Sequence, residues 1–345
     1  LLPILPIILR MSGNETKMID RISLLGYTTL GFFVLSFFIF ILKDLFAQAM
    51  TLFGYLFNSE QSIDDSKREF MKKGLTIGVI GISGMGSTYG FYSSRKGPTV
   101  IDQDIFIESL PDQFDNFSIA QISDLHVGPT IKIKYVDNVL KKLEHVNPDL
   151  IAVTGDLVDG SVKHLSKDLQ PFKDMVASHG TFFVTGNHEY YSGVDPWLDE
   201  TDRLGMTNLI NENRLISKEG AQIALAGITD FKAHQIKKGH RSDPGKALRG
   251  IDEDMVKVML AHQPNSIHAV HQAGVDLQLS GHTHGGQFWP FTYPTKLANA
   301  YLAGHYDHEG TQIYVNRGTG YWGPPLRIGV PAEITLIRLK KKVVL

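Results

Sequence analysis

Short apolar runs alternate with amphipathic stretches over the second part of this chain. Five runs have the length and composition of buried strands. They cover residues 117–123, 150–154, 181–185, 256–261 and 276–280. Apolar positions recur at helical spacing in 133–146, 165–178, 197–204 and 267–273, and further strands are expected at 223–228 and within 313–339. Strands that alternate with helices in this way predict an α/β layered fold.

The first 93 residues follow a different pattern, in which long apolar stretches carry no charge. Residues 24–42 are nineteen uncharged residues in a row, long enough to cross a bilayer core as a helix. Residues 75–93 are also uncharged but rich in Gly and Ser, and predict a weaker second span. The short apolar stretch 45–57 leaves two interpretations open, the return half of a hairpin or an interfacial helix.

These patterns divide the chain into a membrane region, a polar linker and a folded domain. The three parts are residues 1–93, 94–116 and 117–342. Residues 1–9 look like the end of another apolar segment, and the chain does not begin with Met. We therefore expect the natural N-terminus to lie upstream of residue 1.

Basic residues indicate how the chain is oriented in the membrane. Lys67, Arg68, Lys72 and Lys73 directly precede the second apolar stretch. Positive flanks tend to stay in the cytoplasm, so the region after residue 93 is expected outside the cytoplasmic membrane. Residues 66–72 also resemble a twin-arginine export signal, with lysine in place of the first arginine. An ordinary solvated loop is the alternative, because acidic residues lie in the same stretch.

Charge and composition exclude several classes of function. The 345 residues include 34 Lys and Arg against 36 Asp and Glu, which argues against a nucleic-acid binder that neutralises many phosphates. The chain has no cysteine, which excludes disulfides, thiolate nucleophiles and Cys-ligated zinc. A metal site in this chain must therefore be built from His, Asn and carboxylates.

Polar residues follow each of the five buried-strand candidates. They form the stretches Asp124-Leu125-His126, Gly155-Asp156-Leu157-Val158-Asp159, Gly186-Asn187-His188-Glu189, His262 and Gly281-His282-Thr283-His284. Taken singly, each has an ordinary explanation, such as a helix cap, a turn or a core histidine. Ligands in α/β folds gather beyond the carboxyl ends of strands. The joint order and placement of the five stretches therefore predict one shared site.

Seven of these side chains are suitable metal donors. They are Asp124, His126, Asp156, Asn187, His262, His282 and His284. Oxygen and nitrogen ligands of this kind suit Mn, Fe or Zn. Seven donors are too many for one ion, but they suit two ions about 3.5–4 Å apart that share a bridging carboxylate. We also expect His282 and His284 to point the same way from an extended backbone.

In order and spacing these motifs resemble the calcineurin-like metallophosphoesterases. The family pattern is Asp-x-His, Gly-Asp-x-x-Asp, Gly-Asn-His-Asp/Glu, a single His and Gly-His-x-His, and none of these motifs is broken here. The resemblance covers about residues 117–340. Residues 285–287, the tail 324–333 and the apolar front resemble the branch described as transmembrane proteins with a metallophosphoesterase domain. The resemblance implies a four-layer αββα sandwich, two mixed sheets with helices outside, preceded by transmembrane helices.

The resemblance also implies a role for each side chain. One divalent or trivalent ion would be bound by Asp124, His126, Asp156 and His284, and the other by Asp156, Asn187, His262 and His282. His188 would be the catalytic residue, contacting the substrate phosphate or protonating the leaving oxygen. Asp159 and Glu189 would support the ligands. Arg317 and Arg327 are candidates for holding a substrate phosphate, with ordinary surface arginines as the alternative.

The implied activity is hydrolysis of phosphate esters or pyrophosphates at a membrane surface. Membrane tethering favours a lipid or lipid-linked substrate, such as a glycerophospholipid, a polyprenyl carrier or an acylated nucleotide sugar. A pyrophosphatase of the UDP-diacylglucosamine type is a narrower alternative, and a non-catalytic scaffold on the same fold is an alternative from another class. The expected partners are the lipid bilayer and a phosphorylated small-molecule or lipid substrate, with no nucleic acid. The oligomeric state and the choice between monoester, diester and pyrophosphate stay open.

Overall fold

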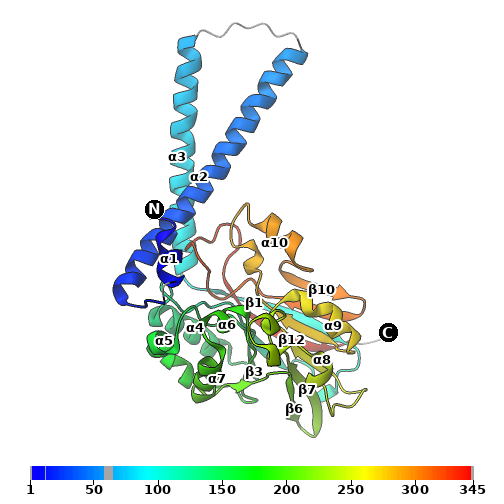
Figure 1. The fold of residues 1–345 in the computed structure, drawn as a ribbon. Helices are drawn as coiled ribbons and strands as arrows, with labels where there is room; N and C mark the ends of the chain where they lie inside the picture. The colour runs from blue at the N-terminus through cyan, green and yellow to red at the C-terminus, as the bar shows by residue number, and fades with distance from the viewer. Residues whose placement is uncertain (1, 12, 58–64, 343–345) are drawn as a thin grey trace.

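Two six-stranded sheets form the centre of the structure, a computed structural model that describes residues 2–11, 13–57 and 65–342 (Figure 1). In the order of adjacent strands, the first sheet contains β1 (Thr99–Ile107), β12 (Glu333–Lys341), β2 (Ser118–Ile122), β3 (Leu150–Val153), β4 (Thr181–Phe183) and β5 (Thr207–Asn208). The second contains β10 (Gly304–His308), β11 (Thr311–Val315), β9 (Leu277–Ser280), β8 (Lys257–Leu260), β7 (Ala221–Gly227) and β6 (Glu212–Lys218). Pairing is parallel from β2 to β5 and from β7 through β8 and β9 to β11, so the carboxyl ends of these strands share one edge in each sheet.

Helices cover the outer face of each sheet. α4 (Ile133–Val146), α5 (Val162–Leu169) and α7 (Val194–Arg203) pack on the first sheet, and α8 (Pro244–Ala247) and α9 (Ile267–Gln272) pack on the second. The loops contain α6 (Asn187–Ser192), α10 (Thr292–Ala298) and the short 3-10 helices Asp112–Phe114, Gln170–Asp174, Ala233–Gln235, Lys238–His240, Pro264–Ser266 and His284–Gly286. Asn147 ends α4 in the left-handed conformation, directly before Pro148, which disfavours further helix.

The alternation of side chains along the strands produces four layers. In β2, Ile119 packs between the sheets, whereas Ile122 packs against the outer helices. In β8, Val258 and Leu260 pack between the sheets, whereas Met259 faces the helices of the other side. Because both faces of these strands are covered, they appear in the sequence as mostly apolar runs. The predicted αββα sandwich is confirmed.

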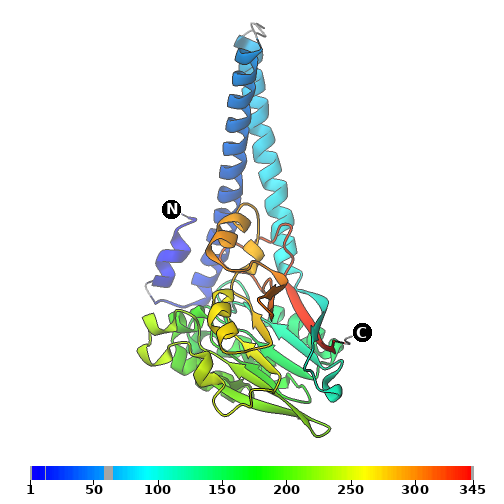
Figure 2. The ribbon, with the colours of Figure 1, turned by 90° about the vertical axis from the view of Figure 1, so that its right-hand side faces the viewer.

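The front of the chain forms a hairpin of two long helices that stands away from the sheets (Figure 1, Figure 2). α1 (Leu5–Met11) precedes α2 (Lys17–Leu56) and α3 (Asp65–Arg95). Among the helices of the described ranges, α2 is the one that is long and apolar enough to cross a membrane, judged by length and composition. The first predicted span, 24–42, lies inside α2. The second, 75–93, lies inside α3 and stays a prediction as a span.

Two expectations about the first 116 residues are wrong. The stretch 45–57 is neither a return crossing nor a separate interfacial helix, because α2 continues unbroken to Leu56. The stretch 94–116 is not a plain linker, because β1 lies within it and pairs in parallel with β12. β1 is an edge strand with alternating exposed and buried positions, so it shows no continuous apolar run. The export-signal-like stretch begins α3, and the side chains of Lys67 and Arg68 lie outside the described part of the chain.

The core between the sheets makes a stability prediction. Leu260 in β8 is fully buried there, so Leu260→Ala should lower the free energy of unfolding by about 2–5 kcal/mol through lost burial and a cavity. Leu215→Ala in β6 is the matched control, because that leucine is 47% exposed. Denaturant unfolding of the full chain in detergent measures both. Equal losses for the two variants would contradict the placement of Leu260.

Candidate metal centre

The five predicted motifs meet where the carboxyl ends of the two sheets adjoin. The loops after β2, β3 and β4 carry the Asp124, Asp156 and Asn187 motifs, and the loops after β8 and β9 carry His262 and His282. The site therefore takes side chains from both sheets. Below it, the side chain of Gln121 in β2 donates a 2.8 Å hydrogen bond to the carbonyl of Ser280 in β9, which ties the sheets together.

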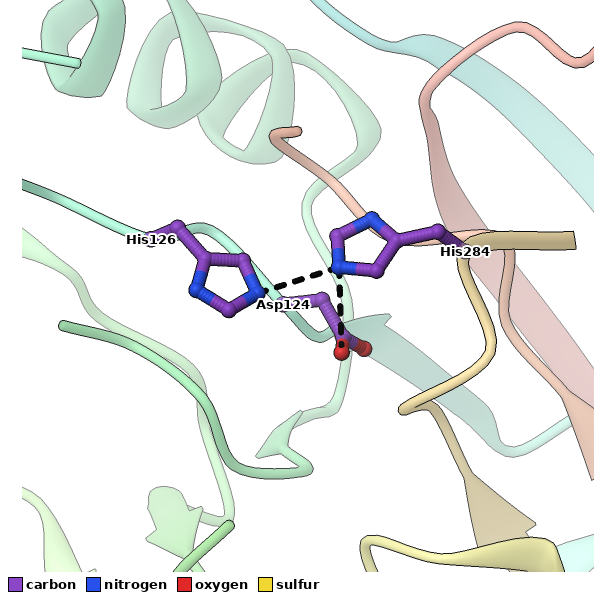
Figure 3. Close-up of side chains that lie close together, drawn as sticks. All are labelled: Asp124, His126 and His284. Carbon is purple, nitrogen blue, oxygen red and sulfur yellow. Dashed lines mark hydrogen bonds and ion pairs between the residues drawn. The ribbon is translucent and has the colours of Figure 1, made fainter. Parts of the chain in front are cut away.

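Asp124, His126 and His284 form one compact group of donor atoms (Figure 3). One candidate ligand atom from each side chain lies within 4.8 Å of the others. His284 Nε2 is 3.0 Å from His126 Nε2 and 3.6 Å from Asp124 Oδ1. All three residues are buried, although a charged carboxylate and polar rings gain nothing from burial alone. This grouping is one that can hold a metal ion.

Asp156, His262 and His282 form a second group, and Asp156 connects it to the first. Asp156 Oδ2 lies 3.2 Å from His262 Nε2 and 3.9 Å from His126 Nε2. One carboxylate oxygen thus faces histidines of both groups. Burial favours the neutral carboxyl and so opposes this arrangement, but the facing His262 and His188 lower the pKa of Asp156 below its ordinary value.

The amide of Asn187 is a further observation that supports a metal site. Its Oδ1 is buried and has no hydrogen-bond partner among the described residues. A buried carbonyl oxygen without a partner is costly, unless a ligand such as a cation satisfies it. Asn187 opens α6 beside His188, whose backbone N–H donates 2.8 Å to Asp156 Oδ1. The loop that carries Asn187 is therefore bonded directly to Asp156.

The backbone of the donor loops is unusual. Left-handed φ angles occur at Asp124 (52°), His126 (52°), Asp156 (50°), His282 (72°) and His284 (50°). Residues other than glycine adopt this conformation uncommonly, although Asp and His do so more readily than most, and such backbone concentrates at functional sites. The expected extended backbone at His282 and His284 is wrong. The two rings instead enter different donor groups.

Two glycines of the motifs leave room for carboxylates that approach them closely. A Cβ at Gly186 would lie 2.2 Å from Asp156 Oδ1, and one at Gly281 would lie 2.2 Å from Asp124 Oδ2. Both distances are far inside van der Waals contact. Any side chain at either position would displace a candidate ligand. This close approach explains why glycine occupies both positions.

Hydrogen bonds orient the donors. His262 Nδ1 lies 2.7 Å from the carbonyl of Thr154 and donates to it, so Nε2 is the atom that faces Asp156. Asp124 accepts from the backbone N–H of His282 (2.9 Å) and from the hydroxyl of Ser123 (2.5 Å). These contacts hold the reactive atoms of both side chains toward the centre of the site.

Glu189 has the contacts that a supporting residue needs. Its carboxylate accepts from the backbone N–H groups of Asp156 (3.0 Å), Leu157 (2.8 Å) and Gly186 (2.6 Å). It thereby joins the loop after β3 to the loop after β4. Burial and the neighbouring Asp156 raise the pKa of Glu189 to about 7, despite these hydrogen bonds.

His188 lies at the edge of the donor groups, and Asp159 holds it. His188 Nδ1 hydrogen-bonds to Asp159, whose other oxygen lies 3.4 Å from His126 Nδ1. The opposite nitrogen, Nε2, is 3.9 Å from Asp156 Oδ2, so His188, His126 and Asp156 also form a group that can hold an ion. Burial disfavours the charged ring, but Asp159 and Asp156 outweigh it and raise the pKa of His188 to about 9. The predicted non-ligand role of His188 stays a prediction.

The two candidate arginines differ in how they relate to the donor groups. Arg317 donates a 2.6 Å bond to Glu333, and its contact with a substrate phosphate stays a prediction. Arg327 is fully buried rather than on the surface. Its guanidinium contacts His284 Nδ1 (3.0 Å) and donates to the carbonyl of Gly320 (2.5 Å). Sequence reasoning missed this positioning contact because no periodicity or motif marks a single arginine in a loop.

Comparison with known proteins gives the family. A model described as calcineurin-like phosphoesterase matches residues 117–286. An uncharacterized metallophosphoesterase of Helicobacter pylori is 36% identical over 314 residues, which cover 89% of this chain and 80% of the relative. The chain belongs to the calcineurin-like metallophosphoesterase family. The predicted family is confirmed, and the chain is a metal-dependent phosphoric ester hydrolase.

Two vertebrate metallophosphoesterases extend the similarity to the front of the chain. Both are named transmembrane protein with metallophosphoesterase domain. The relative from Danio rerio is 33% identical over 332 residues, covering 93% of this chain and 74% of the relative. The one from Bos taurus is 34% identical over 330 residues, with coverages of 92% and 74%. The apolar helix α2 is therefore part of a shared organisation.

The shared position of Asp156 makes a prediction about metal content. Asp156→Ala should lose metal from both donor groups, because one carboxylate serves both. His126→Ala should weaken mainly one group. Elemental analysis of the purified full chains measures the metal-to-protein ratio. An unchanged ratio in the Asp156 variant would contradict the bridging assignment.

Proposed function

We propose that this metallophosphoesterase uses two metal ions, bridged by Asp156, to hydrolyse phosphate ester or pyrophosphate bonds of a lipid or lipid-linked substrate. The observation that carries the proposal is the position of Asp156 Oδ2, at 3.2 Å from His262 and 3.9 Å from His126. A carboxylate shared in this way suits a dinuclear centre better than two separate ions. The donor chemistry favours Mn, Fe or Zn.

The chain's own residues supply positioning and proton transfer. A two-metal centre contributes electrostatic stabilisation of the attacking and leaving oxygens in a displacement at phosphorus. The candidate for proton transfer is His188, because Asp159 holds its Nδ1 and leaves Nε2 facing the site. Tyr191 and Trp322 pack edge-on against the His188 ring at 5.3 and 5.7 Å, and both are largely exposed. His188 thus stands between the donor groups and the protein surface.

The membrane anchor supports a substrate that resides in or near a bilayer. α2 is joined through the same chain to the catalytic unit, and relatives with this organisation are named transmembrane proteins. A tethered enzyme samples substrates at the membrane surface at high effective concentration. A glycerophospholipid, a polyprenyl carrier phosphate and an acylated nucleotide sugar all meet this requirement. A UDP-diacylglucosamine-type pyrophosphatase is the narrower form of the proposal.

Substitution of His188 tests the proposed chemistry. His188→Ala should retain metal but lose turnover of aryl phosphate mono- and diesters by roughly 10²–10⁴-fold, the usual contribution of a general acid. The full chain in detergent is assayed with Mn, Fe or Zn, and metal content is measured in parallel. His164→Ala is a matched control, because that partly buried histidine pairs with Asp20 away from the donor groups. A His188 variant that purifies without metal would make this residue a ligand instead.

The proposed location of the catalytic unit also has a direct test. We propose that it lies outside the cytoplasmic membrane, with α3 as a second crossing, on the basis of the basic residues that begin α3. Protease added to intact spheroplasts of a bacterial host should then digest the region after Arg95. Digestion only after lysis would place the catalytic unit in the cytoplasm.

A further inference from the structure

Two loops beside the candidate metal centre pack against the helical hairpin. The first, residues 284–291, leads into α10, and the ring of Phe38 in α2 lies 6.0 Å from Trp289 and 6.4 Å from Phe291. The second, residues 321–330, carries Leu326. A Cβ at Gly31 of α2 or Gly90 of α3 would lie 2.6 or 3.0 Å from this leucine. The loops therefore contact both helices directly.

Hydrogen bonds join the two loops, residues 284–291 and 321–330, into one platform. The side chain of Gln287 donates 3.0 Å bonds to the carbonyls of Trp322 and Pro324 and accepts a 2.9 Å bond from the N–H of Trp322. The backbone N–H of Arg327 donates 3.0 Å to the carbonyl of Gly90 in α3, and its guanidinium reaches His284. The platform thus connects the hairpin to a candidate metal ligand.

The position of Phe38 determines the depth of this platform. A helix needs about 20 residues to cross the hydrocarbon core of a bilayer. Every stretch of that length between Ile22 and Leu56, after the charged residues at the start of α2, contains Phe38. If α2 crosses a membrane, Phe38 lies within the crossing part, whichever stretch that is. Trp289 and Phe291, which touch Phe38, then lie at the same depth.

α10 lies on the side of the catalytic unit from which the hairpin extends (Figure 1, Figure 2). Together with the platform, α10 exposes large apolar side chains. We define the lipid-facing surface as Phe291 (41% exposed), Tyr293 (64%), Leu297 (89%) and Trp322 (49%). Tyr293 and Leu297 are four residues apart on α10 and share one of its faces. Leu297 is the most exposed of the large apolar side chains that the structure describes. Water is a poor environment for such a group of side chains.

We propose that the lipid-facing surface inserts into the bilayer beside α2. The occupant is the bilayer itself, because the surface adjoins the apolar helix α2 through the contacts of Phe38 with Trp289 and Phe291. Tyr and Trp suit the interface, where an apolar ring meets a polar layer. Lys296, exposed on α10, suits contact with lipid phosphates. Trp322 joins this surface to the His188 ring, so the candidate metal centre lies next to the headgroup layer.

The absence of cysteine provides a clean test. Leu297→Cys in the full chain places one nitroxide label on α10, at a site too exposed to perturb folding. Leu215→Cys, on β6 at the far end from the hairpin, is the matched control, and Phe37→Cys on α2 reports the bilayer (Figure 1). In phospholipid vesicles, EPR power saturation compares collisions with oxygen, which partitions into lipid, and with a water-soluble nickel chelate.

The label at position 297 should favour oxygen, as the label at position 37 does, whereas the label at 215 should favour the nickel chelate. Position 297 behaving like 215 would overturn the proposal. Protection of position 297 from both agents would also overturn it, since a protein partner or a second copy would then cover α10. A water-accessible label at position 37 would show that this part of α2 does not lie in the bilayer, and would also overturn the proposal. None of these outcomes depends on the proposed phosphoesterase chemistry.

Discussion

The carboxylate of Asp156 is the group on which the rest of the site depends. It is buried at the junction of two sheets, where an isolated charge is unfavourable, and histidines from both donor groups surround it. Glu189 fixes its loop through three backbone N–H groups, and Gly186 leaves room for its Oδ1. These contacts are consistent with a buried carboxylate that is stabilised by positive charge on both sides. That charge comes from protonated histidines or from metal ions.

The sandwich supplies this geometry because its parallel strands bring loops from distant parts of the chain to one edge. The loops after β2, β3 and β4 of the first sheet carry some of the donors, and the loops after β8 and β9 of the second sheet carry the others. The first and second donor groups each combine residues from both sheets. Gln121 and Arg327 then tie these loops to one another and to the tail of the chain. The hairpin attaches to the same tail through Gly90, so the hairpin and the site share a boundary.

The sequence predicted the parts of the structure that are buried on both faces. β3 is a continuous apolar run and β8 is mostly apolar, and a motif follows each directly, so strands, their order and donor residues were recognisable together. The edge strand β1 was missed because its exposed positions interrupt the apolar run. The left-handed backbone at His282 and His284 was also missed, since turn geometry depends on contacts such as the Asp124 bond to His282. The role of each donor stays a prediction from the family pattern.

The central claim, two ions bridged by one carboxylate, is tested most directly by EPR of the full chain titrated with manganese. Two Mn(II) ions about 3.5–4 Å apart and bridged by Asp156 should be magnetically coupled. At two equivalents, the account predicts an exchange-coupled spectrum with more hyperfine lines than a single ion gives. A spectrum at two equivalents that is the sum of isolated Mn(II) ions would contradict it.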